Sequence, residues 1–289
     1  SPSASLPPPP SPDEVVAADI VAGLATMAAP SNLTPTLEKA PFDSPAATFD
    51  GCHEDYLAIS KQPCVYGDPN GTKTVILFGD SHLEQWLPAF DLAGKADHWK
   101  VVNWTKATCP LVNFTVVSAQ LHRSYPECDA WKTRTIARVA AAHPDLVFAG
   151  AGDDDSAKAV SDARWTAGTV ATLQLLKQAA QAPVVYMEDT PFSDQRGAPC
   201  VAAHLNDVRT CDFAVSTAYH SPARHVAQHD AVTAAGFPTV EPIHWLCTAT
   251  SCPVIVGNLL VYRDRQHISA SYGRWLAPVI QPLLQRAWR

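Results

Sequence analysis

The chain has 289 residues, of which 47% are hydrophobic and 17% are charged, and its formal net charge is −7. This composition is that of a globular protein with enough apolar side chains for one large core or two small ones. Lysine and arginine are scattered rather than gathered in a basic stripe, so no nucleic acid partner is expected, and no apolar window of about 18 residues could cross a membrane.

The N-terminal part of the chain has few regular features. Residues 1–13 are rich in Pro and Ser, which predicts a linker. A short helix is expected from Asp13, because acidic residues fall in its first turn. Turn-forming residues then dominate with little periodicity. We interpret residues 14–70 as an irregular N-terminal extension that wraps around a domain of residues 71–289.

From Thr72 onward, short apolar segments alternate with helical patterns. The expected strands, apolar and partly β-branched, lie at 74–79, 100–104, 145–150, 183–187 and, less clearly because of its prolines, 238–243. The expected helices span 83–95, 127–143, 162–180, 223–236 and 268–288. Pro278 and Pro282 could kink or interrupt the last of these. The alternation predicts βαβ units and a mostly parallel sheet in an α/β fold.

The eight cysteines fall in the sequence as four neighbouring pairs. Their even number, without the Cys-x-x-Cys pairs of a zinc ribbon, favours local disulfides and an oxidising compartment. The connectivity is an assumption, because eight cysteines can pair in many ways. The assumed pairs are Cys52–Cys64, Cys109–Cys128, Cys200–Cys211 and Cys247–Cys252. The alternative is a cytosolic protein with buried free thiols, which thiol counting with and without reductant would reveal.

Ser81 lies directly after the first strand of the predicted sheet, in the sequence Gly-Asp-Ser-His. Ligands bind open parallel sheets at the carboxyl ends of the strands. A helix that begins there turns unpaired N–H groups toward the same place, which suits the oxyanion of acyl transfer. The alternative is that Ser81, or Asp80, only caps the following helix.

Asp264 and His267 are three residues apart, just before the last predicted helix. A carboxylate in this position can orient an imidazole that faces a nucleophile. Asp-x-x-His alone is common by chance. Together with Ser81 at a strand end of an α/β chain, it predicts a Ser–His–Asp site.

These motifs resemble the first and last blocks of the SGNH (GDSL-like) hydrolase superfamily. The resemblance is closer to the SGNH domains fused behind bacterial membrane acyltransferases of the acyltransferase-3 family. It is carried by "GDSHLEQWLPAF", "TKATCP" at 105–110, "PDLVFAG" at 144–150, "YRDRQHISASYG" at 262–273 and the arm "LTPTLEKAPFDSP". It covers about residues 30–289.

The resemblance implies a three-layer α/β/α, flavodoxin-like fold and no cofactor or metal. It implies that Ser81 is the nucleophile, that His267 is the general acid and base, and that Asp264 orients His267. It also implies an extracytoplasmic O-acyltransferase domain, tethered to the membrane by an N-terminal acyltransferase domain. Such a domain would pass a short acyl group, most plausibly acetyl, to a carbohydrate or glycolipid acceptor. The alternatives are a secreted carbohydrate esterase and a catalytically idle glycan-binding module.

The sequence departs from this family where the family places its other oxyanion donors. The second block has no Gly, and Lys106 or a neighbouring backbone N–H could take its place. In the third block, Asp153 or Asp154 stands where the family has Asn. The backbone N–H of Ser81 is therefore the first donor we expect, with Lys106 and Asp154 as tentative ones. A carboxylate can donate only when it is protonated.

Three other groups of residues suggest weaker interpretations. His225 and His229 have the spacing of a zinc site, with His220 nearby, but no His-Glu-x-x-His motif is present, which favours solvated surface histidines. Residues 153–155 lack the pattern of a calcium loop. Trp86 and Trp104 flank the expected site and could stack on a sugar, although core positions are commoner for Trp.

Overall fold

The computed structural model describes residues 8–59, 64–153, 160–192 and 197–288. Its centre is a seven-stranded sheet with the order β1–β4–β3–β7–β8–β10, and β2 also pairs with β4. The strands are β1 (His53–Glu54), β2 (Cys64–Gly67), β3 (Lys73–Gly79), β4 (Trp99–Lys106), β7 (Leu146–Gly150), β8 (Val184–Met187) and β10 (Thr239–Val240). Every pairing is parallel except that of β2 with β4. The sheet is therefore the mostly parallel one that the sequence predicts.

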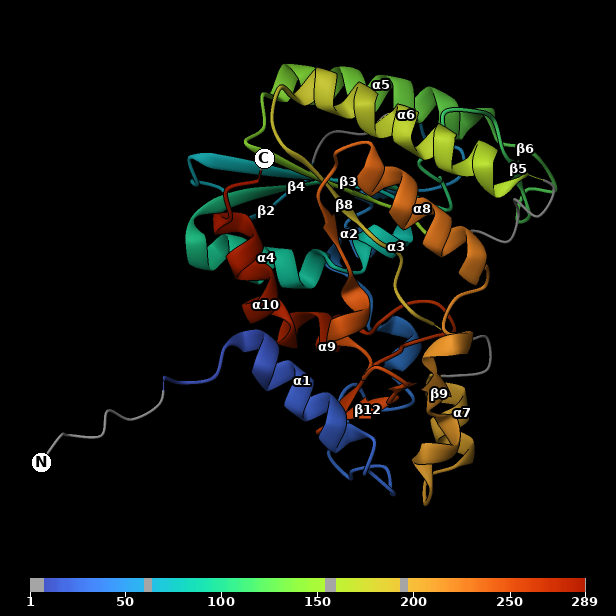
Figure 1. Cartoon of the computed structure of the whole chain (residues 1–289). Helices are drawn as coiled ribbons and strands as arrows, with labels where there is room; N and C mark the ends of the chain where they lie inside the picture. The colour runs from blue at the N-terminus through green and yellow to red at the C-terminus, as the bar shows by residue number, and fades with distance from the viewer. Residues whose placement is uncertain (1–7, 60–63, 154–159, 193–196, 289) are drawn as a thin grey trace, which may run out of the picture.

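Helices cover both faces of this sheet, which gives the three layers seen in Figure 1. One face carries α5 (Pro126–Ala142), α6 (Asp162–Ala180) and α8 (Pro222–Ala234). The other carries α3 (Ser81–Glu84), α4 (Leu87–Asp97), α9 (Ala270–Trp275) and α10 (Ala277–Gln285). The α/β/α architecture that the resemblance implies is confirmed.

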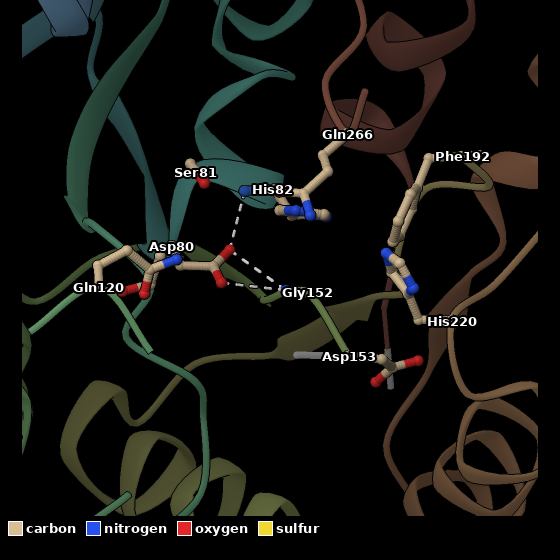
Figure 2. Close-up of a pocket in the computed structure, with 10 residues that line it drawn as sticks. Asp80, Ser81, His82, Gln120, Gly152, Asp153, Phe192, His220 and Gln266 are labelled. Atoms are coloured by element: carbon tan, nitrogen blue, oxygen red, sulfur yellow. Dashed lines mark hydrogen bonds between the residues drawn. The ribbon is translucent and has the colours of Figure 1, made fainter. Parts of the chain in front are cut away.

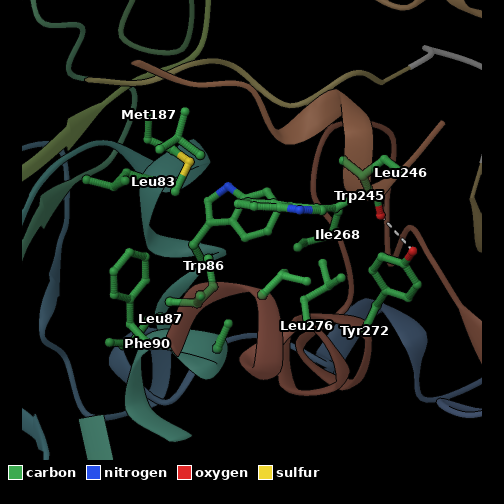
Figure 3. Close-up of a cluster of buried hydrophobic side chains, with 14 of the residues drawn as sticks. Leu83, Trp86, Leu87, Phe90, Met187, Trp245, Leu246, Ile268, Tyr272 and Leu276 are labelled. Carbon is green, nitrogen blue, oxygen red and sulfur yellow. Dashed lines mark hydrogen bonds between the residues drawn. The ribbon is translucent and has the colours of Figure 1, made fainter. Parts of the chain in front are cut away.

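Strand β3 shows how two cores form on one sheet. Val75 and Leu77 belong to the core under α4 and α10, whereas Ile76 and Phe78 belong to the core under α5 and α6. This follows from the two-residue period of a strand, and burial on both faces explains why the segment is apolar throughout. Figure 3 shows the first core around Trp86 and Trp245.

Two predicted helices are each split into two in the structure. The segment predicted at 83–95 contains α3 and α4, because Pro88 lies in the first turn of α4 and cannot continue a preceding helix. The segment predicted at 268–288 breaks between α9 and α10, just before Pro278. Pro282 lies inside α10 without ending it.

The N-terminal residues contact several parts of the domain. Helix α1 (Pro12–Gly23) begins with a capping box of Ser11 and Glu14, and Asp13 accepts a hydrogen bond from the indole of Trp245 at 2.8 Å. Both β1 and β2 pair with β4, so two short segments of residues 14–70 extend the central sheet. The smaller elements of this region are η1 (Ala40–Phe42) and α2 (Ala46–Phe49).

A smaller lobe lies beyond the α4 and α10 layer (Figure 1). Its short elements are α7 (Ala198–Ala203), η3 (Val208–Cys211), β9 (Phe213–Ala214), β11 (Ser251–Cys252), β12 (Ile255–Val256) and β13 (Leu259–Leu260). Four further short elements complete the fold: η4 (Val215–Thr217), η5 (Pro242–Trp245), and the strands β5 (Val117–Ser118) and β6 (Arg123–Ser124), which pair as a hairpin. A third core, including Leu33, Val201 and Leu260, joins the extension to this lobe.

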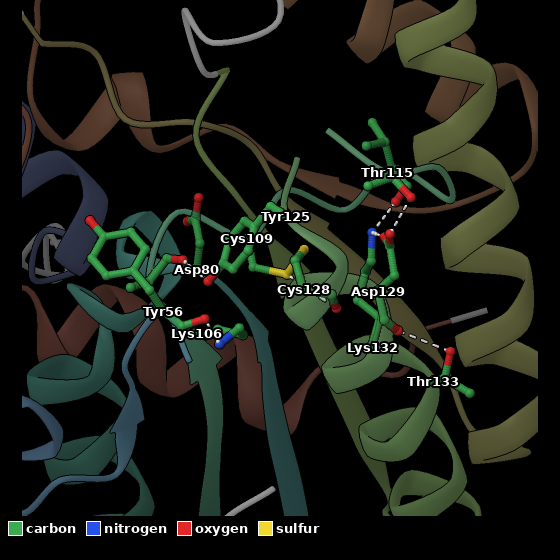
Figure 4. Close-up of a disulfide and its surroundings, with 12 residues drawn as sticks. Tyr56, Asp80, Lys106, Cys109, Thr115, Tyr125, Cys128, Asp129, Lys132 and Thr133 are labelled. Atoms are coloured by element: carbon green, nitrogen blue, oxygen red, sulfur yellow. Dashed lines mark hydrogen bonds and ion pairs between the residues drawn. A yellow bond between two sulfur atoms is a disulfide. The ribbon is translucent and has the colours of Figure 1, made fainter. Parts of the chain in front are cut away.

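All eight cysteines form disulfides between sequence neighbours. The bridges are Cys52–Cys64, Cys109–Cys128, Cys200–Cys211 and Cys247–Cys252. Figure 4 shows the second of these, which joins the segment after β4 to the first turn of α5. Among the described residues, no helix has both the length and the apolarity needed to span a membrane.

Candidate active site

Ser81 is the first residue of α3, directly beyond the carboxyl end of β3. Only a glycine fits at position 79, because β3 and β7 lie very close together there. A Cβ atom on Gly79 would lie only 1.8 Å from the carbonyl oxygen of Gly150. Asp80 is the N-cap, and its carboxylate accepts hydrogen bonds from the backbone N–H groups of His82 and Gly152 (Figure 2). Asp80 therefore performs the capping role, which leaves the hydroxyl of Ser81 for another contact.

That contact is with His267, although 186 residues separate the two in sequence. The Nε2 atom of His267 lies 3.0 Å from the Oγ of Ser81. Its Nδ1 atom lies 3.0 Å from both carboxylate oxygens of Asp264. The same carboxylate accepts the backbone N–H groups of Gln266 and His267, each at 2.8 Å, which fixes its orientation. The three residues that the sequence predicts as a triad are thus linked by hydrogen-bonding contacts, from Ser81 to His267 and from His267 to Asp264.

The local electrostatics keep His267 neutral and Asp264 charged. Burial lowers the pKa of His267 below its ordinary value, although the hydrogen bond and charge of Asp264 oppose this. Burial alone would raise the pKa of Asp264, but the hydrogen bond and charge of His267 outweigh it and bring the pKa well below its ordinary value. Arg263, at 3.2 Å from Asp264, acts in the same direction. A neutral imidazole beside a hydroxyl can accept its proton.

The pocket at Ser81, called here the Ser81 pocket, is lined in part by residues that the sequence analysis did not select. Figure 2 shows Phe192 and His220 across from Asp80 and Ser81. His82 also lines this pocket, and its Nδ1 lies 2.6 Å from Asp189, a residue just after β8. No local motif connects Asp189 to Ser81, since 108 positions separate them (189 − 81). The available signal was its position after an apolar strand.

Lys106 does not serve as the oxyanion donor that the sequence suggested. Its ammonium group donates to the backbone carbonyls of Asp55, Tyr56 and Ala58, at distances of 2.5 to 3.1 Å. A lysine ammonium has three protons, and these contacts account for all of them. Lys106 is also not among the described residues that line the Ser81 pocket. Its fully buried side chain instead fixes residues 55–58 against β4.

Of the two aspartates at the family's third block, the structure describes Asp153 but not Asp154. Asp154, the other tentative donor, lies outside the described residues. Asp153 is buried and lines the Ser81 pocket, where its carboxylate lies 3.2 Å from Nδ1 of His225. Burial raises the pKa of Asp153, although His225 opposes this. Its oxygens face donors from α8, so Asp153 acts as an acceptor here.

The two tryptophans considered for sugar stacking are core residues. Trp86 is fully buried and Trp104 is 6% exposed, and neither is among the described residues that line the Ser81 pocket. They lie in the cores on opposite faces of the sheet. The sugar-stacking interpretation is therefore wrong for both.

The histidines of α8 are less solvated than expected. His225 and His229 both contact Glu188, at 3.5 and 2.6 Å. Glu188, His229 and Glu241 bring one possible metal-ligand atom each within 4.8 Å of one another. Glu188 directly follows β8 and Glu241 directly follows β10. Both are distant in sequence from His229, so the His-Glu-x-x-His motif could not reveal them. Within this cluster His229 and Glu188 share a hydrogen bond, whereas Glu241 is exposed.

A mostly parallel α/β sheet with a Ser–His–Asp contact beyond its strand ends defines a protein of the serine hydrolase and acyltransferase class. The family model described as "SGNH domain (fused to AT3 domains)" matches residues 51–282. The chain belongs to this SGNH domain family, as the two end motifs indicated. None of the curated proteins matches the sequence.

Several solved structures are similar to this chain. The periplasmic domain of a lipopolysaccharide acetyltransferase from Salmonella ser. Paratyphi A is 14% identical, with a TM-score of 0.61, over 76% of this chain and 86% of that one. A putative acylhydrolase from Bacteroides fragilis is also 14% identical, with a TM-score of 0.45, over 76% and 89% of the two chains. A GDSL-like lipase from Bacteroides thetaiotaomicron is 13% identical, with a TM-score of 0.41, over 74% and 88%. The likeness to the Salmonella domain, at 14% identity, is one of fold alone.

Proposed function

We propose that this chain is an extracytoplasmic O-acyltransferase domain that transfers a short acyl group, most plausibly acetyl, to a cell-surface glycan or glycolipid. Membership of the SGNH family supports acyl transfer or ester hydrolysis in general. The observation that carries the proposal is the pair of 3.0 Å contacts from Ser81 through His267 to Asp264.

In the proposed reaction, Ser81 carries the acyl group between donor and acceptor. The Nε2 atom of His267 takes the hydroxyl proton of Ser81 as the serine oxygen bonds to the acyl carbonyl carbon. His267 then returns the proton to the leaving group, and an acyl-serine remains. In the second half, His267 takes a proton from the acceptor hydroxyl, which attacks the acyl-serine. The proton finally returns to Ser81, so the enzyme is regenerated.

The proposed location is the extracytoplasmic side of a membrane, beside an N-terminal membrane acyltransferase domain. Four disulfides favour an oxidising compartment. The family is one whose SGNH domains are fused to AT3 domains, and the Salmonella structure is a periplasmic domain by its description. That protein's description as a lipopolysaccharide acetyltransferase also supports a glycolipid acceptor for this chain.

Hydrolysis of p-nitrophenyl acetate by the Ser81→Ala variant tests the proposal. We expect kcat/KM to fall at least about 1,000-fold, because loss of a nucleophilic serine removes the covalent pathway. Ser124→Ala, which alters an exposed serine of β6, is the matched control and should leave the rate unchanged. Labelling of Ser81 by a fluorophosphonate provides a second measurement. Equal hydrolysis by wild type and Ser81→Ala would overturn the proposal.

The pH dependence of kcat/KM should report the ionisation of His267. The rate should rise with pH as the imidazole loses its proton, with a midpoint below 6.5, because burial lowers the pKa from that value. Asp264→Asn removes an interaction that raises the pKa of His267. In this variant the rise of kcat/KM should therefore shift to lower pH, while the plateau rate falls. A limb centred above 6.5 in the wild type would contradict the assignment of His267 as the base.

Two alternatives have distinct results in the same assays. With an excess of a sugar added as acceptor, a secreted esterase would still pass the acyl group to water, whereas a transferase would form acylated sugar. An idle glycan-binding module would bind sugar but neither hydrolyse the ester nor react with fluorophosphonate.

A further inference from the structure

His82 forms a second histidine–aspartate pair beside Ser81. Its Nδ1 atom lies 2.6 Å from Oδ1 of Asp189. Asp189 is fully buried and held by two further hydrogen bonds, from the backbone N–H groups of Asp153 at 2.9 Å and Thr190 at 2.7 Å. The ring of His82 lies edge-on to that of His267, with 5.1 Å between their centroids. Two imidazoles, each held by its own aspartate, thus lie next to Ser81.

The surroundings of His82 favour its charged form. Burial alone would lower the pKa of His82, but nearby carboxylates raise it to about 10. Those that act on it are Asp189 first, then Asp80 and Asp264. Asp153 also interacts with it, and the facing imidazole of His267 stays neutral because its own pKa is lowered. These carboxylates favour the imidazolium form of His82, in which both ring nitrogens carry N–H groups.

Among the residues that the structure describes, only one of those N–H groups has a partner. Nδ1 is committed to Asp189, and among the described residues Nε2 forms no hydrogen bond. The ring lines the Ser81 pocket. Thr108, which follows β4, also lines this pocket, and its buried hydroxyl has no hydrogen-bond partner within the part of the chain that the structure describes. Nε2 of His82 is not among the fully buried unpartnered atoms, and the side chain is 10% exposed, so this nitrogen is open to a ligand in the pocket.

Two side chains at the positions where the family places oxyanion donors, Lys106 and Asp153, face other partners in this structure. Lys106 donates to three carbonyls elsewhere, and the carboxylate of Asp153 faces His225. We infer that Nε2–H of His82 donates a hydrogen bond to the oxyanion that forms when Ser81 attacks an acyl group, and that Asp189 positions His82 for this purpose. This inference rests on the proposed function.

The chemistry of this step is a hydrogen bond rather than a proton transfer. The proton of Ser81 goes to His267, and His82 keeps both of its protons throughout. As the carbonyl π bond opens, negative charge develops on its oxygen next to the His82 cation. A positively charged donor in a largely buried site stabilises this charge more than a neutral donor does.

The substitution His82→Asn tests the inference while it preserves local structure. An asparagine amide can still donate to Asp189 from near the Nδ1 position, but it removes the Nε2 donor. We expect kcat for p-nitrophenyl acetate to fall about 100- to 1,000-fold with little change in KM, as on loss of one oxyanion donor. Phosphonylation of Ser81 should slow similarly.

The matched control is His98→Asn. His98 also forms a hydrogen bond through Nδ1 to an aspartate, Asp68 at 2.7 Å, but its side chain is 80% exposed. This variant should retain the wild-type rate. An unchanged thermal midpoint for His82→Asn would separate a catalytic loss from a folding defect, and His82→Gln, which restores a neutral donor near Nε2, should recover part of the rate.

A pH profile of Asp189→Asn distinguishes a positioning role from a structural one. Without its nearest carboxylate, the pKa of His82 should fall from about 10 toward its ordinary value of 6.5. The variant should therefore lose activity as pH rises above about 7, while the wild-type rate stays level to much higher pH. A merely structural role would lower the rate equally at every pH.

Two results would overturn different conclusions. If Ser81→Ala is inactive but His82→Asn keeps kcat within about threefold of wild type, the role of His82 is wrong and the proposed function stands. If neither Ser81-dependent hydrolysis nor labelling occurs in the wild type, the proposed function fails, and the inference fails with it.

Discussion

At the scale of single residues, Gly79 sets how closely β3 and β7 approach where the active-site turn begins. The pairing of Gly79 with Gly150 places two residues without side chains opposite each other at the strand ends. The close approach brings Asp80 within hydrogen-bonding distance of Gly152 and thereby fixes the start of α3.

We predict that Gly79→Ala destabilises the protein strongly. The added methyl would lie 1.8 Å from the carbonyl oxygen of Gly150, so the two strands would have to separate. The expected loss is about 3 kcal/mol in the free energy of unfolding, measured by denaturant titration. Gly273→Ala in α9, where the nearest atom would be 3.3 Å away, is the control and should change stability by less than about 1 kcal/mol. Similar values for both variants would contradict the steric argument.

At the scale of elements, short irregular segments are fixed to the sheet by covalent and polar contacts. The Cys52–Cys64 bridge joins the neighbourhoods of β1 and β2, which both lie along β4. The Cys109–Cys128 bridge anchors the segment after β4, which carries Thr108 at the Ser81 pocket, to α5 (Figure 4). Disulfides here compensate for the small apolar area that such segments bury.

The disulfides should differ in their contributions to stability. Chain-entropy arguments give about 3 kcal/mol for Cys109–Cys128, whose cysteines are 19 residues apart, and about 2 kcal/mol for Cys247–Cys252, which are 5 apart. Replacing each pair by alanines and measuring the free energy of unfolding checks this order. A larger loss for the shorter loop would show that native packing, rather than loop closure, dominates.

At the scale of the whole molecule, a buried carboxyl group couples the N-terminal extension to the active-site helix. Glu84 of α3 is 1% exposed and accepts a hydrogen bond from Thr48 of α2 at 2.7 Å. Burial raises the pKa of Glu84 from 4.5 to about 7, although Thr48 and Arg263 oppose this. The folded protein therefore binds this proton more tightly than the unfolded chain does.

This coupling predicts a stability that decreases with pH. Between pH 4.5 and about 7 the folded state retains the proton of Glu84 and the unfolded state loses it, so the free energy of unfolding should fall as pH rises. Urea titrations at pH 5 and pH 8 would measure this fall, which Glu84→Gln should reduce. Glu38→Gln, an exposed control, should leave it unchanged. An equal fall in wild type and Glu84→Gln would contradict the assignment.

The central elements could be predicted from the sequence because their patterns are local. Continuous apolar segments marked β3, β7 and β8, since strands covered on both faces need no polar alternation. The Asp264 and His267 pair could be recognised for the same reason, because the two residues are three positions apart in one loop. The breaks at α3 and α10 were harder to place, because Pro282 is tolerated within a helix whereas Pro88 and Pro278 lie in first turns.

By itself the sequence determined the class of fold, the family and the residues that begin and end the candidate site. Only the tertiary structure decided that Asp189 pairs with His82, that Lys106 faces residues 55–58, and that the two tryptophans lie in the cores. The physical reason is the separation in sequence over which each kind of interaction acts. Periodicity and short motifs act within one segment, whereas the partner of a buried polar group depends on which strands become neighbours, and no local pattern encodes that order.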